Sequence, residues 1–162
     1  MNAGKKDMHI DPEIPMEQQI AFLRQSGLVF QFNTFEILKE KLGNEGVEIF
    51  KDIIRKGTSE GIEHIKEKSF EEIAQVSGIP DKILGLDVKK DYIKPDEFQY
   101  SITYCPYLEE SKRRNMGMDL CDIIEDVQLE EINKNLAEIT EPIRMCRGDS
   151  KCTITMKNTF GR

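Results

Sequence analysis

The sequence predicts an α+β fold: a helical N-terminal half packed on a small antiparallel sheet, with a C-terminal hairpin that closes the structure. Three observations predict it. Apolar residues recur at helical spacing in the first half, apolar and polar residues alternate in "EFQYSITYC", and two strand-like segments flank the polar turn "RGDS" near the C-terminus. We expect a flexible N-terminal arm over residues 1–15 and a single domain over 16–162, with a helical half, 16–85, and a second half, 86–162.

The helical half begins with an expected short helix from Met16, where apolar residues recur every three or four positions, to about Gly27. A second helical pattern starts near Thr34. Gly43 and Gly46 interrupt this pattern, so it is either one broken helix or two. The segment 57–60 then offers a helix stop and a new cap.

A further helix is predicted after Ser69, which stands three residues before Glu72 in the spacing of a capping box. Gly78, Pro80 and Gly85 then break the helical pattern. We therefore expect strands after about residue 85.

The second half opens with the alternating segment, which predicts a strand that ends at Cys105. Pro106 suits the first turn of a short helix, because proline lacks the amide hydrogen that would be unsatisfied there. Asp119 is expected to cap a strongly amphipathic helix that carries Cys121 in its first turn. The segments "TEPIRMC" and "KCTITMK" then form the closing hairpin. A five-residue loop would place Cys146 and Cys152 opposite each other, with Cβ atoms about 4.5–5.5 Å apart, and a four-residue loop would place them diagonally.

Composition narrows the class of protein. The 162 residues are 38% hydrophobic and 33% charged, with a formal net charge of -7, which argues against nucleic acid as a partner. No stretch has the roughly 18 apolar residues of a membrane span, and the first residues lack the apolar core of a secretion signal. We expect a cytoplasmic protein with a small-molecule ligand and no membrane partner, and a homodimer stays open.

The four cysteines have the spacing C-x15-C-x24-C-x5-C, which matches neither a zinc finger nor a ferredoxin. In a reducing compartment they are candidates for metal ligands or reactive thiols, although free cysteines are often simply buried. The helix N-terminus would lower the pKa of Cys121, and the basic residues 112–114 would lower that of Cys105.

A base to activate such a thiol is harder to find. The only histidines are His9, in the arm, and His64, which more simply occupies a solvated helix position. A carboxylate is the better candidate. Asp126 lies five positions beyond Cys121, a rotation of about 140° around a helix, and this places it next to the apolar stripe, where it could point into a cleft.

Candidate ligand-binding residues are Tyr104, Arg113 and Arg147. The run "SKRR", which contains Arg113, is most simply a solvated face. An arginine there could alternatively bind a substrate carboxylate with two hydrogen bonds.

Residues 98–157 resemble the L-2-amino-thiazoline-4-carboxylic acid hydrolase family. The features that carry the resemblance are Cys105-Pro106, Cys121, Asp126, Gly148-Asp149 and Cys152. The resemblance implies hydrolytic opening of a thiazoline ring to an N-carbamoyl cysteine. It points to Cys105, Cys121 and Asp126 as catalytic residues.

That family is similar to the vinyl-4-reductase-type small-molecule-binding domains, in which cysteines around a closing hairpin can hold zinc. This implies zinc or iron bound by a set of four cysteines, Cys105, Cys121, Cys146 and Cys152, or otherwise no cofactor. Three hypotheses remain open. The first is a hydrolase that acts on a C-N or C-S bond through cysteine or a cysteine-bound metal. The second is a binding domain for a small molecule or metal without turnover. The third is a thiol redox accessory that uses Cys146 and Cys152.

Overall fold

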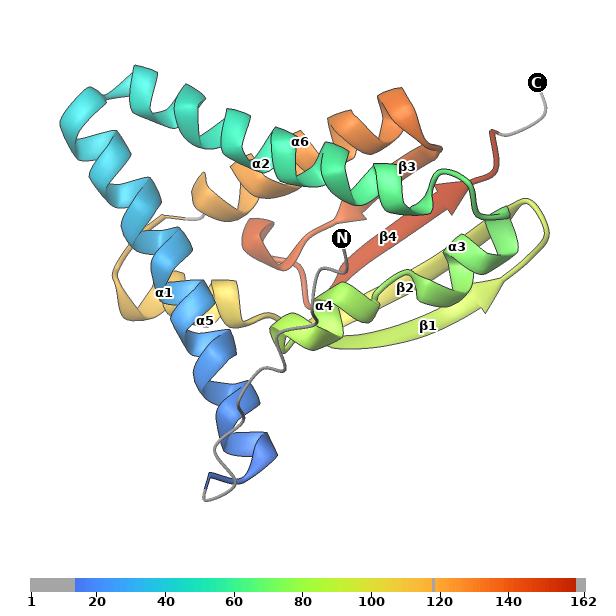
Figure 1. Cartoon of the computed structure of the whole chain (residues 1–162), viewed down its shortest axis with the longest axis horizontal. Coiled ribbons are helices and arrows are strands. Elements are labelled where there is room, and N and C mark those ends of the chain that lie inside the picture. Colours follow the sequence, from blue (N-terminus) through green and yellow to red (C-terminus); the bar gives the residue numbers. More distant parts are fainter. Residues whose placement is uncertain (1–13, 118, 160–162) are drawn as a thin grey trace, which may run out of the picture.

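The computed structural model describes residues 14–117 and 119–159 and has the α+β fold that the sequence predicts (Figure 1). The helices are α1 (Met16–Leu42), α2 (Asn44–Ile65), α3 (Phe70–Val76), α4 (Ile79–Leu84), α5 (Pro106–Arg113), α6 (Asp119–Asn135) and the short 3-10 helix η1 (Met145–Arg147). The strands are β1 (Asp87–Ile93), β2 (Glu97–Tyr104), β3 (Glu138–Ile143) and β4 (Cys152–Lys157). Most of the expected N-terminal arm, with His9, lies outside the described residues.

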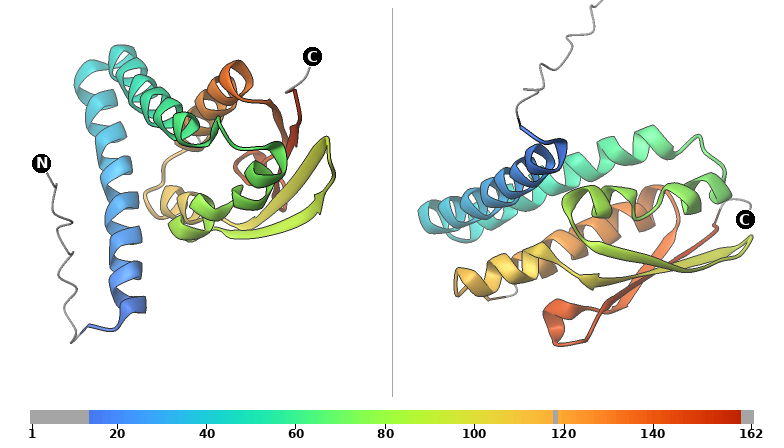
Figure 2. Two further views of the ribbon diagram at one scale, coloured as in Figure 1. Left: turned by 45° about the vertical axis from the view of Figure 1, so that its right-hand side comes forward. Right: turned by 90° about the horizontal axis from the view of Figure 1, so that it is seen from below.

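The strands form one antiparallel sheet in the order β1-β2-β4-β3, with α2, α3, α4 and α6 over one face of it and α1 packed beside α2 (Figures 1 and 2). None of the helices in the described ranges is both long and apolar enough to cross a membrane.

Two of the predicted helix ends are wrong. Gly27 lies inside α1 and Gly57 lies inside α2, because one glycine costs only about 1 kcal/mol within a long helix. The chain instead turns at Gly43, where φ is +60°. Just beyond this turn, a Cβ atom on Gly46 would lie 2.0 Å from the backbone oxygen of Leu38, so only glycine lets α1 and α2 approach so closely.

The capping box before α3 is confirmed. The amide of Glu72 donates to the hydroxyl of Ser69 at 3.3 Å, and the amide of Ser69 donates to the Glu72 carboxylate at 2.8 Å. The predicted break after α3 contains the short helix α4, with Pro80 in its first turn and left-handed glycines at both ends.

The predicted strand before Cys105 is confirmed as β2, and Pro106 does begin a helix, α5. The closing strands β3 and β4 pair as expected, but the register of the two cysteines is different. Cys146 lies in η1 outside the ladder, while Cys152 pairs with Ile102 of β2. The predicted cross-strand pair of Cys146 and Cys152 is therefore wrong, because the connection between β3 and β4 is longer than a simple turn.

Two apolar cores hold these layers together. One lies between the sheet, α3 and the C-terminal parts of α2 and α6, and it includes Phe70, Phe98 and Ile154. The other joins α1, α2 and α6 through buried side chains, among them Phe35 and Phe50. Both cores contact α6, so the helix that carries Cys121 is held from two sides.

Candidate functional site

A small pocket at the start of α6 brings two of the predicted cysteines together. Cys105 enters it from the end of β2 and Cys121 from the first turn of α6. The pocket has a volume of about 60 Å³. Its walls are completed by Asp81, Leu84, Leu86, Tyr107, Ile124, Glu125 and Gln128. We refer to this cavity as the thiol pocket.

Glu125 is the carboxyl group of the thiol pocket nearest in sequence to Cys121, one helical turn further along α6. Its side chain is only half-buried because it lines the cavity. Loss of bulk water nevertheless raises its pKa to about 8, with further contributions from Glu141 and Asp81, whereas Arg144 acts in the opposite direction. Glu125 also donates a hydrogen bond to Glu141 on β3. At neutral pH it is therefore mainly a protonated acid.

Asp81 is a second carboxyl group of the pocket, contributed by α4. Burial raises its pKa, while a hydrogen bond from the hydroxyl of Tyr100 acts in the opposite direction. The two carboxyl groups come from separate elements, since Asp81 lies on α4 and Glu125 on α6. Burial thus raises the pKa of both groups.

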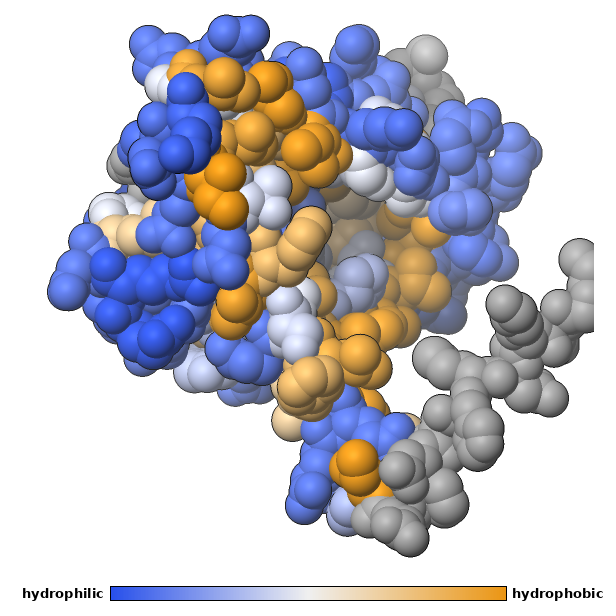
Figure 3. All heavy atoms as spheres, turned by 60° about the vertical axis from the view of Figure 1, so that its left-hand side comes forward, coloured by the Kyte–Doolittle hydropathy of each residue, from blue (hydrophilic) through white to orange (hydrophobic). Residues whose placement is uncertain are grey.

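A larger apolar groove of about 500 Å³ adjoins the thiol pocket. Asp81 and Gln128 line both cavities, so the two share a wall. The groove runs along α2, passes α3 and α4, and ends on α6 and the sheet, with Ile53, Ile54, Ile62, Ile65, Ile73, Val76, Tyr100, Ile132, Leu136, Ile139 and Met156 among its lining side chains. In Figure 3 apolar side chains surround a hollow in the face that carries α1.

Two glycines on α2 keep one side of this groove open. Gly57 and Gly61 are one helical turn apart and both line it. A Cβ atom at either position would meet nothing within 4 Å. Packing therefore does not require glycine at these positions, and each costs up to about 1 kcal/mol relative to alanine. What the missing side chains provide is space in the groove.

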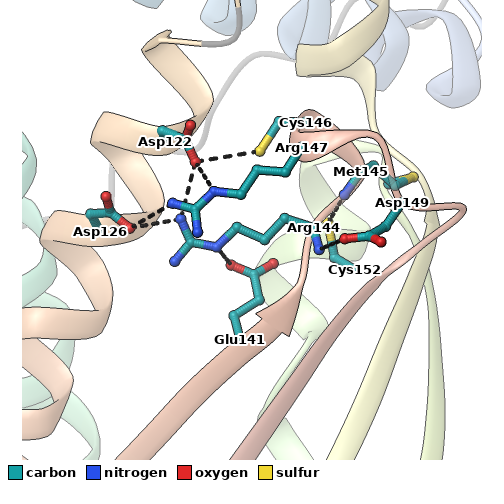
Figure 4. Close-up of polar contacts among 9 residues, drawn as sticks. All are labelled: Asp122, Asp126, Glu141, Arg144, Met145, Cys146, Arg147, Asp149 and Cys152. Carbon is teal, nitrogen blue, oxygen red and sulfur yellow. Dashed lines mark hydrogen bonds and ion pairs between the residues drawn. The ribbon is translucent and has the colours of Figure 1, made fainter.

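A network of ion pairs attaches the segment after β3 to α6 (Figure 4). The buried guanidinium of Arg144 lies 2.9 Å from Glu141 and 2.6 Å from Asp126. The contact with Glu141 joins the Arg144 Nε to the Glu141 Oε2, and it is an ion pair without the geometry of a hydrogen bond. Arg147 lies 2.9 Å from Asp122. The network holds η1, and with it Cys146, beside the first turns of α6.

Cys146 contacts the thiol of Cys121, which donates a hydrogen bond to it, and lies 3.7 Å from a carboxylate oxygen of Asp122. Cys152 is turned elsewhere. Its sulfur accepts a hydrogen bond from the amide of Met145 at 3.3 Å, and its thiol donates one to Glu141. The structure thus brings Cys105, Cys121 and Cys146 to one region and directs Cys152 into a different set of contacts.

The expected decreases in thiol pKa are wrong for both cysteines of the pocket. Burial raises the pKa of Cys121 well above its usual range, and Glu125 raises it further. Burial also raises that of Cys105, by more than the amides of Leu108 and Tyr107 lower it. Desolvation therefore outweighs the helix N-terminus at Cys121.

The basic residues near Cys105 in sequence are engaged elsewhere. Arg113 lies 2.6 Å from Glu110, and Arg114 lies 2.6 Å from Glu110 and 2.5 Å from Glu36. These arginines lower the pKa of Glu110 to about 2. Arg113 is therefore an ion-pair partner on the surface of α5.

The other predicted site residues also lie away from the thiol pocket. Asp126 is exposed and pairs with Arg144 and Arg147, and Tyr104 is half exposed at the end of β2. Arg147 pairs with Asp122. His64 is exposed on α2. In the described part of the chain, none of these side chains lines either cavity.

The four cysteines implied as metal ligands are not gathered into one cluster in the described part of the chain. Within residues 14–117 and 119–159, no group of three or more histidine, cysteine, aspartate or glutamate side chains is placed to hold a metal ion. Cys121 and Cys146 satisfy each other by a hydrogen bond, and Cys152 bonds to a backbone amide and to Glu141.

Sequence reasoning missed Glu125, Asp81 and Glu141. A signal for Glu125 was present, because it follows Cys121 by four residues and so lies one turn above it on the same helix face. Asp126 lies one position further round and faces Arg144. Asp81 and Glu141 gave no such signal, since only the packing of α4 and β3 brings them to the site.

Comparison with known proteins adds no assignment: no protein-family model matches this chain, and no curated protein matches its sequence.

Proposed function

We propose that this protein binds a small organic molecule that has a mainly apolar body and one polar end. The apolar body occupies the groove, and the polar end reaches the thiol pocket. The observation that carries this proposal is the wall of Asp81 and Gln128 that the two cavities share. The 500 Å³ of the groove lies within the range of about 300–1,000 Å³ that is common for small-molecule sites.

Gly57 and Gly61 support the same proposal, because they leave room that packing of the chain does not need. The hydrolase family that residues 98–157 resemble is itself similar to small-molecule-binding domains of the vinyl-4-reductase type, which agrees with a binding role. A binding protein also needs no activated nucleophile, and both thiols of the pocket are protonated at neutral pH.

Hydrolysis of a C-N or C-S bond is the second candidate. It is favoured by Glu125, because a carboxyl group with a pKa near neutrality can both give and take a proton beside Cys105 and Cys121. It is disfavoured by the raised thiol pKa values. The third candidate, a redox accessory that uses Cys146 and Cys152, is less well supported because Cys146 contacts Cys121 instead.

Titration calorimetry with 4-phenylbutan-1-ol tests the binding proposal. We expect binding to the wild type and at least a tenfold loss of affinity in Gly61→Leu, whose side chain would fill the groove. Gly27→Leu is the matched control, since Gly27 is also a helical glycine with nothing within 4 Å of a Cβ atom, and it does not line the groove. Absence of binding, or equal binding by Gly61→Leu and the wild type, would overturn the proposal.

Incubation with 2-amino-thiazoline-4-carboxylate tests the hydrolase. Turnover that is lost in Cys105→Ser and kept in Cys152→Ser would favour catalysis in the thiol pocket.

A cytoplasmic location, a homodimer and a cysteine-bound metal also stay predictions. Cell fractionation, light scattering and metal analysis of protein purified without oxygen address them in turn.

A further inference from the structure

The residues that line the two cavities carry acidic groups and no basic ones. Asp81 borders both cavities and Glu125 borders the thiol pocket. None of the described residues that line either cavity is a lysine or an arginine. A carboxylate on a ligand would therefore meet two carboxyl groups and no cation.

Arg144, a cation close enough to act on Glu125, is already shared among several acids. Arg144 acts electrostatically on Glu125, but its guanidinium lies 2.9 Å from Glu141, 2.6 Å from Asp126 and 3.2 Å from Asp122. The Glu141 side chain is only 1% exposed, and its Oε2 accepts no hydrogen bond. The charge of Arg144 is thus shared among acids that do not line the thiol pocket, and no lysine or arginine among the described lining residues offsets Asp81 and Glu125.

We infer that the ligand is a cationic amphiphile, with an ammonium or amidinium group bound in the thiol pocket between Asp81 and Glu125 and an apolar body in the groove. This inference rests on the proposed function and specifies the ligand class. The pocket volume of about 60 Å³ suits such a head group, since one water molecule needs only about 10–15 Å³ of such space. A charged donor paired with a carboxylate in a desolvated pocket forms a stronger hydrogen bond than a neutral donor does.

The other titratable groups around Glu125 agree with this arrangement. Glu141 on β3, Asp81 on α4, and the thiols of Cys105 and Cys121 surround it, and Arg144 is a positive group that acts on it. Tyr100 donates its hydroxyl proton to Asp81. A bound cation would allow both carboxyl groups to ionise, because it replaces the water that they lost on burial.

Three probes with one apolar body and different head groups test the charge: 4-phenylbutylamine, 4-phenylbutan-1-ol and 4-phenylbutanoate, each titrated at pH 7 by calorimetry. We expect the amine to bind at least tenfold more tightly than the alcohol, and the carboxylate to bind most weakly. In Asp81→Asn and Glu125→Gln the advantage of the amine over the alcohol, expressed as the ratio of their affinities for the same variant, should fall several-fold. Glu130→Gln, an exposed position on the same helix, should keep the full preference.

The outcomes separate the two proposals. Alcohol binding that equals or exceeds amine binding, with loss in Gly61→Leu, would overturn the cationic ligand and retain the groove as a binding site. Tightest binding of the carboxylate would also overturn the cation. A preference for the amine that survives both Asp81→Asn and Glu125→Gln would overturn the assigned position of the head group. Absence of binding by all three probes would overturn the proposed function and this inference together.

Discussion

Glu125 on α6 donates a hydrogen bond to Glu141 on β3, so two carboxyl groups from different elements share a proton beside the thiol pocket. Burial raises the pKa of both groups, and that of Glu125 is about 8. Such a pair is stable only while at least one member is protonated. The site is therefore sensitive to pH, although no histidine lines either cavity in the described part of the chain.

The first prediction concerns stability against pH. The folded protein holds protons that the unfolded chain releases between the ordinary glutamate pKa of 4.5 and about 8. The free energy of unfolding should therefore fall as pH rises through this window. Glutamine mimics the protonated acid and does not titrate. In Glu125→Gln the fall in the free energy of unfolding across this window should therefore be smaller by on the order of 1–3 kcal/mol. Urea unfolding at pH 5, 7 and 9 measures it. Glu130→Gln, at an exposed position of α6, should leave the slope unchanged, and an equal effect of both variants would contradict the assignment.

The second prediction concerns the buried guanidinium. Arg144→Met should lower the free energy of unfolding at pH 7 by about 3–5 kcal/mol, because it leaves Glu141 buried without its positive partner. Arg147→Met is the matched comparison. Arg147 is 52% exposed and its pairing with Asp122 is worth no more than about 1 kcal/mol. Similar losses in both variants would show that burial of Arg144 does not increase its contribution to the free energy of unfolding.

The third prediction concerns thiol reactivity. Because burial raises the pKa of all four thiols, native protein at pH 7.5 should react with iodoacetamide at less than about a tenth of the rate of the urea-unfolded chain. Mass spectrometry of time points gives the rate for each cysteine. A single cysteine that is labelled as fast as in the unfolded chain would indicate an activated nucleophile and would favour the hydrolase.

The fourth prediction compares two glycines. Gly46→Ala should destabilise the protein by about 1–3 kcal/mol, since its methyl group would lie 2.0 Å from the Leu38 oxygen and force α1 and α2 apart. Gly27→Ala should stabilise it by about 0.5–1 kcal/mol, since that position is open and alanine is the better helix former. Thermal unfolding of the two variants measures both effects. A stabilised Gly46→Ala would contradict the close approach of the two helices.

Local patterns in the sequence were enough for the fold class and for several elements. Period-two alternation predicted β2, the spacing of Ser69 and Glu72 predicted the capping box, and Pro106 predicted the start of α5. The ends of α1 and α2 were not predictable in the same way. Gly27 and Gly57 look like helix stops in isolation, but α1 and α2 run through them, because the cost of about 1 kcal/mol for one glycine is small in a helix of this length.

The site was predictable only in part, because its residues come from separate elements. Cys105 and Cys121 were identified from the ends of a strand and a helix, and they do line one pocket. The sequence favoured Asp126 because its position beside the apolar stripe suggested a cleft. Arg144, whose buried position no local pattern indicates, attracts Asp126 instead. Asp81 enters through α4, which the sequence pattern showed only as a break.

Gly57 and Gly61 lie on α2, whereas the acid and thiol groups lie mainly on α6 and its neighbours. Residues of α2 thus determine the width of the groove, whereas residues of other elements determine the chemistry at its end. A larger side chain at either glycine would change which molecules fit without altering the groups that meet their polar end. Size selectivity and charge selectivity can therefore be adjusted independently, which makes this groove a practical starting point for redesign toward chosen ligands.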